Sequence, residues 1–308
     1  MNEERNGLRV LVTGGTGGIG RRLVPVLLRY GYSIRLLVRS PLKATQLFLE
    51  GVELVPWRGE QELPGEVFAG ISGVINLAGA PIARRWTAAY RQEILRSRVA
   101  TTYALSRALC RLEGQRPAVF VSVSATGYYG DKGEQVCTEN TPPGDDFLAQ
   151  VCQQWEVAAW EAAPCVRLVI ARLGIVLDRE SGFLARLLPS FRAFAGGVLG
   201  SGAQWVPWVH WQDVVGFFLW ALQTPTAQGV YNVAAPEPVR LRQMCQMIGQ
   251  QLRRPCWLSI PVVALRLLYG GLADALCASQ RAIPERALRE GFRFRFSTLS
   301  EALQYELQ

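Results

Sequence analysis

The stretch TGGTGGIG at residues 13–20 constrains the fold more than any other feature of the sequence. It follows the apolar run Leu8–Thr13 and precedes a helix that we expect to begin at Gly18, so its glycines have the spacing G-x-x-G-x-x-G. Glycine lets the chain turn tightly, lets backbone amides approach a pyrophosphate, and lets the helix pack closely on the strand. This order of elements predicts a dinucleotide-binding turn made by Gly14, Gly15, Thr16, Gly17, Gly18, Ile19 and Gly20.

Strand-like and helix-like segments alternate through the first half of the chain. This alternation predicts an α/β fold with a doubly wound parallel sheet. Several predicted strands, such as VLV and VINLA, are continuously apolar, as expected when helices cover both faces of the sheet. We expect helices from Gly18, from Trp86 and at 145–163, and strands at 8–13, 33–39, 52–57, 73–77, 119–124 and 166–177.

The composition of the sequence changes after residue 177, where Gly- and Pro-rich stretches separate short predicted elements. We therefore predict that residues 1–177 form an NAD(P)-binding Rossmann domain whose core recruits parts of 205–235. Residues 178–308 are expected to form a smaller, partly interleaved substrate lobe, with 259–308 as a helical C-terminal subdomain.

Composition and hydropathy predict a compact globular chain. Of 308 residues, 49% are hydrophobic and 19% charged, far from disordered or fibrous compositions. The apolar stretch 214–222 is too short to cross a bilayer, and 260–277 is interrupted by Arg266 and Asp274, so no membrane span is expected. Residues 1–10 lack the apolar core of a secretion signal, which predicts a cytoplasmic protein.

Charge and cysteine content exclude further classes of function. The net charge of +8 comes almost entirely from arginines that are scattered along the chain, which argues against a nucleic-acid partner. Seven cysteines, an odd number without a C-x-x-C pair, argue against disulfides, and the single histidine argues against a metal site.

The end of the second predicted strand bears on the choice of cofactor. An acidic residue at this position bonds the ribose 2′-hydroxyl of NAD, whereas an arginine nearby suits the 2′-phosphate of NADP. Here Val38 stands where the acid is expected, and Arg39 follows it. We therefore expect NADP(H) to be preferred over NAD(H), since a guanidinium matches a phosphate well. The alternative is that Arg39 is a solvated charge.

Motifs along the whole chain resemble the extended short-chain dehydrogenase/reductase superfamily: TGGTGGIG, NLAG at 76–79 and VSVSATGYYG at 121–130. Longer segments, among them FLAQVCQQWE and GGVLGSGAQWVPWVHWQD, are similar to its NAD(P)-dependent epimerase family proteins, which carry their own short C-terminal domain. Besides the glycine turn, the resemblance implies cofactor contacts at Val38, Arg39, Leu77, Ala78, Gly79, Glu93, Arg98, Ser124 and Leu177. The alternative for Glu93 and Arg98 is a surface charge pair, and for Leu177 a place in the core.

The catalytic residues that the superfamily implies are only partly present. Ser124 matches the serine that follows the fifth strand, but Leu148 and Cys152 stand where the Tyr-x-x-x-Lys pair should be. No lysine occurs after residue 132, so a shifted alignment does not restore the pair.

A literal Tyr-x-x-x-Lys runs from Tyr128 to Lys132, but in a Gly-rich stretch that does not predict a helix. Tyr128 or Tyr129 alone remains a candidate proton donor, the alternative being aromatic packing. We expect His210 to order the start of a helix and Cys152 to be a small buried hydrophobe.

These observations lead to a primary hypothesis and an alternative. The first is an NADP(H)-binding, extended short-chain oxidoreductase or epimerase acting on an unidentified small molecule, with Arg84, Arg85 and the loop Gly196–Gly202 on the substrate side. The alternative is a catalytically weak NADP(H)-sensing regulatory protein, linked to cell division by labels within the subfamily. A nucleotide-sugar epimerase ranks third because it rests on fold analogy alone. The resemblance leaves a homodimer open.

Overall fold

The computed structural model describes residues 8–48 and 50–308, and it contains a seven-stranded sheet. Residues 1–7, where we expected no secretion signal, and residue 49 lie outside the described residues. The strands of the sheet are β1 (Arg9–Thr13), β2 (Ser33–Val38), β3 (Val52–Pro56), β4 (Ile71–Asn76), β5 (Val119–Ala125), β7 (Arg167–Leu173) and β12 (Gly229–Val233). Their order is β12-β7-β5-β4-β1-β2-β3, and all neighbouring pairs are parallel. The predicted doubly wound α/β fold is confirmed.

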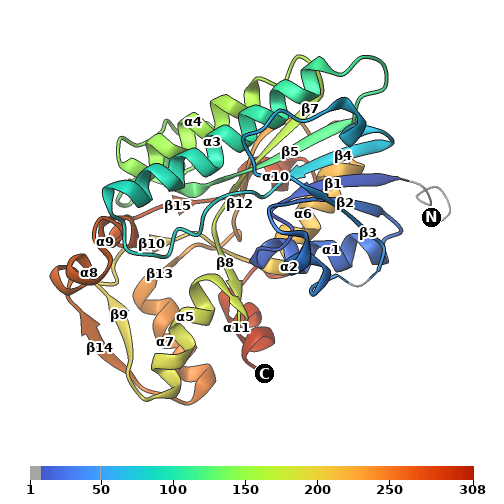
Figure 1. Ribbon diagram of the computed structural model, residues 1–308. Coiled ribbons are helices and arrows are strands. Elements are labelled where there is room, and N and C mark those ends of the chain that lie inside the picture. The colour runs from blue at the N-terminus through green and yellow to red at the C-terminus, as the bar shows by residue number, and fades with distance from the viewer. Residues whose placement is uncertain (1–7, 49) are drawn as a thin grey trace.

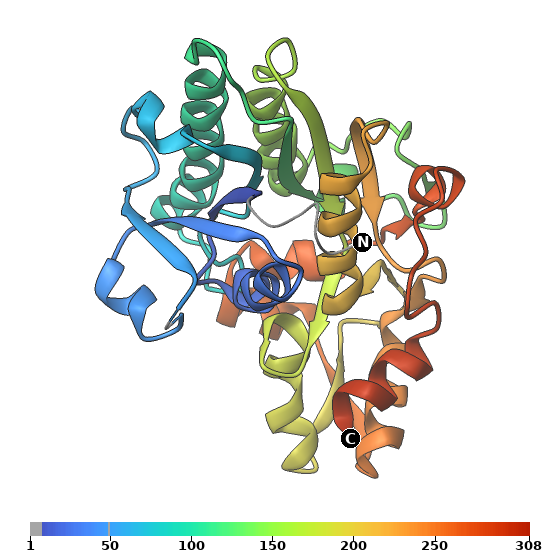
Figure 2. The ribbon, with the colours of Figure 1, turned by 90° about the vertical axis from the view of Figure 1, so that its right-hand side faces the viewer.

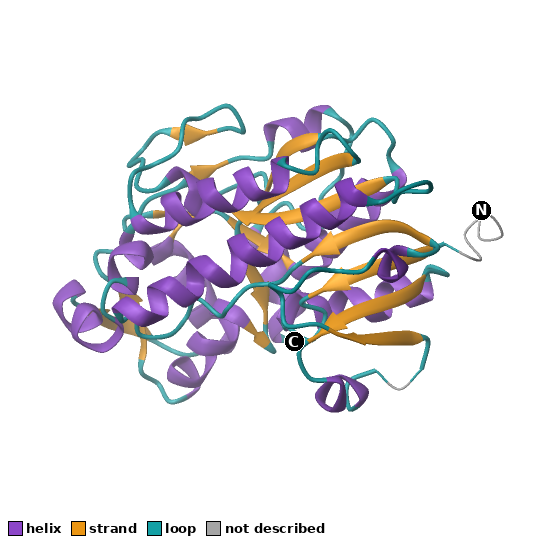
Figure 3. Cartoon of the chain, turned by 45° about the horizontal axis from the view of Figure 1, so that its top comes forward, coloured by secondary structure: helices purple, strands orange, loops and turns teal. Residues whose placement is uncertain are grey.

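Helices cover both faces of this sheet (Figures 1 and 3). One face carries α3 (Ala88–Arg111) and α4 (Phe147–Trp160), which lie side by side, and the other carries α1 (Gly18–Arg29) and α6 (Trp211–Gln223). Alternate residues of β1 enter separate cores: Val10 and Val12 pack with residues of α1 and α6, whereas Leu11 packs with residues of α3. The continuous apolar strands in the sequence result from this double burial.

The strand expected over residues 166–177 is two strands. β7 ends at Leu173, and β8 (Ile175–Asp178) leaves the large sheet to pair with β11 (Trp208–His210). The break falls at Gly174, where a Cβ atom would overlap the backbone carbonyl of Pro207. The close approach of two chain segments therefore requires glycine here and redirects the chain into the second lobe.

A smaller lobe lies beside the sheet, at the lower left of Figure 1 and below the sheet in Figure 2. It is interleaved with the Rossmann part, since the chain returns to the sheet through α6 and β12 before it forms α7. The remaining elements are α2 (Pro41–Thr45), η2 (Gly65–Phe68), η3 (Thr126–Tyr129), β6 (Val136–Cys137), α5 (Gly182–Arg192), β9 (Gly196–Leu199), β10 (Trp205–Val206), β13 (Val239–Arg240), α7 (Leu241–Leu252), β14 (Cys256–Ile260), α8 (Val262–Tyr269), α9 (Leu272–Cys277), β15 (Arg281–Ala282), α10 (Glu285–Arg289) and α11 (Leu299–Leu307).

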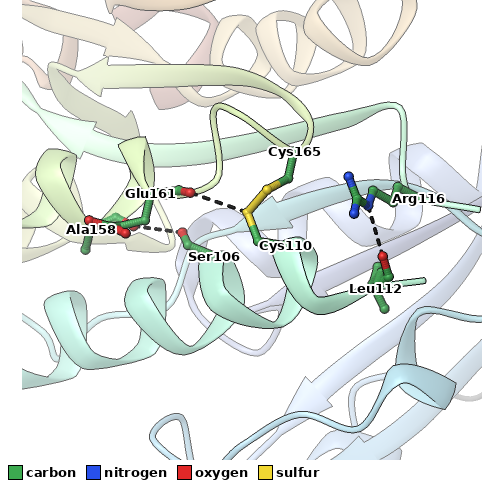
Figure 4. The surroundings of a disulfide bond; sticks show 7 residues. All are labelled: Ser106, Cys110, Leu112, Arg116, Ala158, Glu161 and Cys165. Carbon is green, nitrogen blue, oxygen red and sulfur yellow. Dashed lines mark hydrogen bonds between the residues drawn. A yellow bond between two sulfur atoms is a disulfide. The ribbon is translucent and has the colours of Figure 1, made fainter. Parts of the chain in front are cut away.

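A disulfide joins Cys110 to Cys165, which corrects the expectation that disulfides are absent (Figure 4). Cys110 lies in the last turn of α3, and Cys165 lies in the turn between α4 and β7. The two residues are 55 positions apart in sequence, but the side-by-side packing of α3 and α4 brings their Cα atoms within 5.2 Å. An odd number of cysteines therefore says nothing about one particular pair.

The described residues contain neither a membrane-spanning helix nor a cluster of metal-ligating side chains. None of the described helices is long and apolar enough to cross a membrane. Over the same residues, no group of three or more His, Cys, Asp or Glu side chains is arranged to hold a metal ion.

Candidate functional site

The glycine turn predicted between β1 and α1 has the close packing that a dinucleotide-binding turn needs. Gly14 has a φ of +66°, and a Cβ atom there would lie 2.6 Å from the carbonyl carbon of Leu77. At Gly20 a Cβ atom would overlap the backbone of Gly15. Glycine at both positions thus lets the turn press against the loop after β4 and lets α1 begin immediately.

The N-terminus of α1 has no group of its own that compensates its positive end. The helix begins after Gly17, which provides no side-chain cap, and its first turn contains no acidic residue. The first amides of a helix have no carbonyl partner within the helix, and the helix dipole favours an anion at that end. The Ser181 hydroxyl is a neighbour of this end, since a Cβ atom on Gly18 would lie 2.5 Å from its Oγ.

The loop after β4 is fixed from beneath by Asn76. The Thr13 hydroxyl donates a hydrogen bond of 2.6 Å to Asn76 Oδ1, which also accepts from the Ala78 amide at 3.3 Å. The Asn76 amide donates to the Thr102 hydroxyl on α3 at 2.7 Å. These bonds hold Leu77, Ala78 and Gly79 in place beside the glycine turn.

Arg98 of α3 lies directly against this loop. Its guanidinium is 7% exposed, donates to the carbonyl oxygens of Ile94 and Ala80 at 3.1 and 3.0 Å, and lies over the ring of Trp155. Burial lowers its pKa. Among the described residues no carboxylate pairs with it. Glu93 lies on the same helix but is exposed, and its side chain accepts no hydrogen bond from a described residue.

Arg39 lies exposed immediately after β2, whereas Val38 is buried and its carbonyl accepts from the Trp57 amide at 2.8 Å. No described acidic side chain pairs with Arg39.

Two polar residues near Arg39 were not identified from the sequence. The Ser40 side chain does not cap α2, although it precedes that helix, and exposed Arg58 follows β3 at the same edge of the sheet. Ser40 could have been identified from the sequence, because its hydroxyl directly follows Arg39.

Ser124 ends β5 within a buried polar network. It is 1% exposed, and its hydroxyl donates a hydrogen bond of 2.7 Å to Glu156 Oε1. Arg172 of β7 binds both oxygens of the Glu156 carboxylate at 2.8 Å. The serine proton is therefore directed to a carboxylate of α4, which sequence reasoning about Ser124 did not foresee.

Leu148 and Cys152, which we expect at the positions of the Tyr-x-x-x-Lys pair, lie on the face of α4 that meets η3. Leu148 and Cys152 lie one turn apart on α4, and a Cβ atom on Gly127 of η3 would contact both side chains. Cys152 is buried, and burial raises the pKa of its thiol to about 12. It is thus protonated near neutral pH and is a poor nucleophile.

The two candidate tyrosines have different environments. Tyr129 is fully buried; its hydroxyl donates to Asn232 Oδ1 at 2.7 Å and accepts from Arg172 at 3.0 Å. Burial raises the pKa of this phenol well above its usual range. Protein groups therefore take up the hydrogen bonds of the Tyr129 hydroxyl, which favours Tyr128 of the two tyrosines. Tyr128 is half-buried, and the Arg172 guanidinium lies 3.5 Å from the centroid of its ring.

The remaining candidate residues named from the sequence have structural roles. Lys132 donates to the Pro143 carbonyl and lies beyond the end of η3, so it does not form a helical pair with Tyr128. His210 caps α6 by accepting from the Gln212 amide, as expected, and its Nε2 is 2.9 Å from Glu306. Leu177 is fully buried in the core of the smaller lobe.

Residues 10–234 match the family model described as the NAD dependent epimerase/dehydratase family. The chain belongs to this family. Residues 260–306 match a second model, a domain of unknown function (DUF1731), so the C-terminal helices α8 to α11 fall almost wholly within a segment with its own family. The predicted resemblance to epimerase family proteins with a short C-terminal domain is confirmed.

Relatives of this epimerase/dehydratase family member extend over nearly the whole chain. The chloroplastic homolog of epimerase family protein SDR39U1 from Arabidopsis thaliana is 40% identical over 318 residues, covering 100% of this chain and 89% of the relative. Epimerase family protein YfhF from Bacillus subtilis is 34% identical over 298 residues, covering 96% of this chain and 97% of the relative.

Solved structures of the family share the fold. The crystal structure of human epimerase family protein SDR39U1 with NADPH has a TM-score of 0.87 and 32% identity, covering 97% of this chain and 99% of that one. A UDP-glucuronic acid 4-epimerase from Bacillus cereus, in complex with UDP-glucuronic acid and NAD, has a TM-score of 0.78 over 97% of this chain and 98% of that one. At 16% identity, the second likeness concerns the fold alone.

The residues expected on the substrate side of this epimerase/dehydratase family member lie in two places. Arg84 and Arg85 are exposed in the loop before α3, with Arg84 over the ring of Tyr90. The loop Gly196–Gly202 contains β9, which pairs with β14, so its first residues serve the packing of the smaller lobe. Its later part approaches α9, since a Cβ atom on Gly200 would lie 3.2 Å from Cys277 Sγ.

Proposed function

We propose that this protein binds NADP(H) and acts as an oxidoreductase on a small molecule. The observation that carries the proposal is the uncompensated N-terminus of α1 behind the glycine turn, together with the unpaired guanidinium of Arg39 at the end of β2. The first fits a pyrophosphate, and the second fits a 2′-phosphate. A human relative solved with NADPH supports the same cofactor.

The chain offers a continuous set of groups to this cofactor. The amides of Gly18 to Gly20 would hold the pyrophosphate, and Arg39 with Ser40 would hold the adenosine phosphate. Leu77 to Gly79 would line the opposite side of the cleft, with Arg98 buried against them. When bound, the cofactor supplies or accepts a hydride.

Proton transfer in the proposed reaction falls to a different group from the usual helical tyrosine. Leu148 and Cys152 cannot supply it, and Tyr129 is enclosed. We assign the role to the Tyr128 hydroxyl, because Tyr128 follows β5 by a few residues and Arg172 lies over its ring. The Ser124 hydroxyl donates to Glu156, so its oxygen is left to accept a hydrogen bond from the alcohol form of the substrate.

The proposal is tested by following NADPH oxidation against a panel of small aldehydes and ketones. We expect turnover with at least one member, and a fall of ~100-fold or more in kcat for Tyr128→Phe, as for loss of a general acid. Tyr103→Phe is the matched control, since Tyr103 is exposed on α3. Affinity for NADPH should be the same in all three proteins. Equal rates in Tyr128→Phe and the control would refute the assignment.

The apolar pair Leu148 and Cys152 favours a second candidate function, an NADP(H) sensor in which cofactor binding sets conformation and little chemistry follows. Tight binding of NADPH without oxidation by any carbonyl compound in the panel would support it. A nucleotide-sugar epimerase needs the missing acid–base pair most and ranks below both.

A further inference from the structure

A small cavity lies between the start of β8 and the C-terminal segment. Its volume is about 60 Å³, far below the ~300–1,000 Å³ of most ligand pockets. All but one of the described residues that line it are apolar, and none is charged. Its lining includes Ile175, Phe183, Leu199, Trp205, Leu276 and the single polar residue, Gln280.

The wall of this cavity comes from both family segments. Ile175, Phe183 and Leu199 belong to the larger one, whereas Leu276 and Gln280 belong to the segment 260–306. Leu276 is fixed through its carbonyl, which accepts from the Gln204 side chain at 3.0 Å. The domain of unknown function therefore contributes one side of the apolar lining.

The cavity lies close to the position of the missing acid–base pair. Leu276 packs in the same hydrophobic cluster as Leu148, the residue that replaces the catalytic tyrosine. Both leucines pack against the buried cluster of Trp86, Ile94, Val151 and Leu272, which therefore joins α4 to the cavity wall.

The cavity is also close to the cofactor turn. Phe183 follows Ser181, whose hydroxyl neighbours Gly18 at the start of α1. Ile175 and Phe183 both pack against the cluster that contains Leu177. Residues 181–183 therefore connect the start of α1 to the cavity wall.

Trp205 gives this wall a fixed shape. The guanidinium groups of Arg240 and Arg281 lie 4.4 and 4.5 Å from the centroid of its ring, and its indole Nε1 donates to Glu134 at 3.0 Å. Arg240 is itself paired with Glu134. These charged side chains contact the tryptophan but do not line the cavity, so they are not available to an anionic ligand inside it.

We propose that this cavity is the binding site for the non-reacting part of the substrate, and that the substrate is a small apolar carbonyl compound. The proposal rests on the oxidoreductase function above and narrows its substrate class. Gln280 leaves room for one polar atom in that non-reacting part, because its side-chain amide has no partner among the described residues. A nucleoside diphosphate sugar needs cations and many polar partners, which this lining lacks.

The test is binding and not turnover, measured by ligand-observed NMR titration with cyclopentanone and, separately, with UDP-glucose. Each titration is run with and without saturating NADPH. We expect saturable binding of cyclopentanone and none of UDP-glucose at the same concentration. Leu276→Gln, which places an amide in the wall, should weaken cyclopentanone binding about tenfold or more. Leu199→Gln provides a second variant on the opposite family segment.

The matched control is Leu267→Gln, the same change at an exposed position of α8 in the same C-terminal segment. It should bind cyclopentanone as the wild type does. Absence of saturable cyclopentanone binding, binding of UDP-glucose in its place, or equal effects of Leu276→Gln and Leu267→Gln would overturn the proposal. Failure to bind NADPH alone would refute the cofactor assignment and leave the cavity result standing.

Discussion

At the scale of single residues, Glu156 is a buried carboxylate that joins three elements of the fold. Its carboxylate is 6% exposed and takes two hydrogen bonds from Arg172 and one from Ser124. Removing one member of a buried ion pair leaves the other charge uncompensated, which costs more than losing one neutral hydrogen bond. The network thus fixes the end of β5 to both α4 and β7.

Glu156→Gln and Ser124→Ala should therefore differ in stability. We expect the first to lower the free energy of unfolding by about 3–5 kcal/mol, because it leaves Arg172 buried without a carboxylate. The second should cost about 1–2 kcal/mol, because Glu156 keeps its bonds to Arg172. Urea denaturation followed by circular dichroism measures both. Equal losses would show that the Arg172 pair does not dominate this site.

Among elements, α1 is tied to the smaller lobe through the turn between β8 and α5. Arg22 binds the carboxylate of Asp178 at 2.7 Å, and Asp178 also accepts from the Ser181 hydroxyl. Burial alone would raise the pKa of Asp178, but the hydrogen bonds from Arg22, the Glu180 amide and Ser181 hold it below its ordinary value. The helix that starts at the phosphate turn therefore shares an ion pair with the substrate side.

This ion pair predicts a pH dependence with a definite sign. A depressed carboxyl pKa stabilises the fold above the unfolded pKa of about 3.9, and the gain is lost as pH falls through the lower folded pKa. Asp178→Asn should thus be less stable than wild type at pH 7, and the difference should shrink below about pH 4. Glu180→Gln, which alters an exposed partner of the same arginine, is the control. A difference independent of pH would contradict this account.

The disulfide between α3 and the α4–β7 turn should add to the stability of that helix pair. Closing a loop of this length in the unfolded chain contributes about 2–4 kcal/mol. Cys110→Ser should lower the urea midpoint under non-reducing conditions, and dithiothreitol should bring the wild type to the same value. Cys256→Ser is the control, since Cys256 is a free, half-buried thiol. If dithiothreitol lowered the urea midpoint of Cys110→Ser further, the loss of stability would come from a different disulfide.

Local signals in the sequence were sufficient for most elements but not for contacts between distant segments. The glycine turn and the apolar strands were predictable because their causes lie within a few residues. The break at Gly174 depends on Pro207, and the disulfide joins residues 55 positions apart, so neither has a local signature. Likewise the position of Ser124 was predicted, whereas its bond to Glu156 depends on how α4 packs against β5.

On the scale of the whole molecule, we propose that both lobes contribute residues to one ligand-binding site. The Rossmann part supplies the turn and Arg39, and the smaller lobe supplies Ser181 and the apolar cavity walled partly by the C-terminal segment. Interleaving through α6 and β12 joins the lobes through continuous elements as well as through surface contacts. Binding at either part is therefore expected to affect the other.

Selection of NADP(H) by Arg39 is tested by calorimetric titration with NADPH and with NADH. Wild type should bind NADPH more tightly than NADH, and Arg39→Ala should weaken NADPH binding by about tenfold or more, the worth of a charge-assisted hydrogen bond, while leaving NADH binding unchanged. Arg29→Ala, the same change at the exposed far end of α1, should behave as the wild type does. Equal affinities for the two cofactors in wild type, or binding of neither, would contradict the claim.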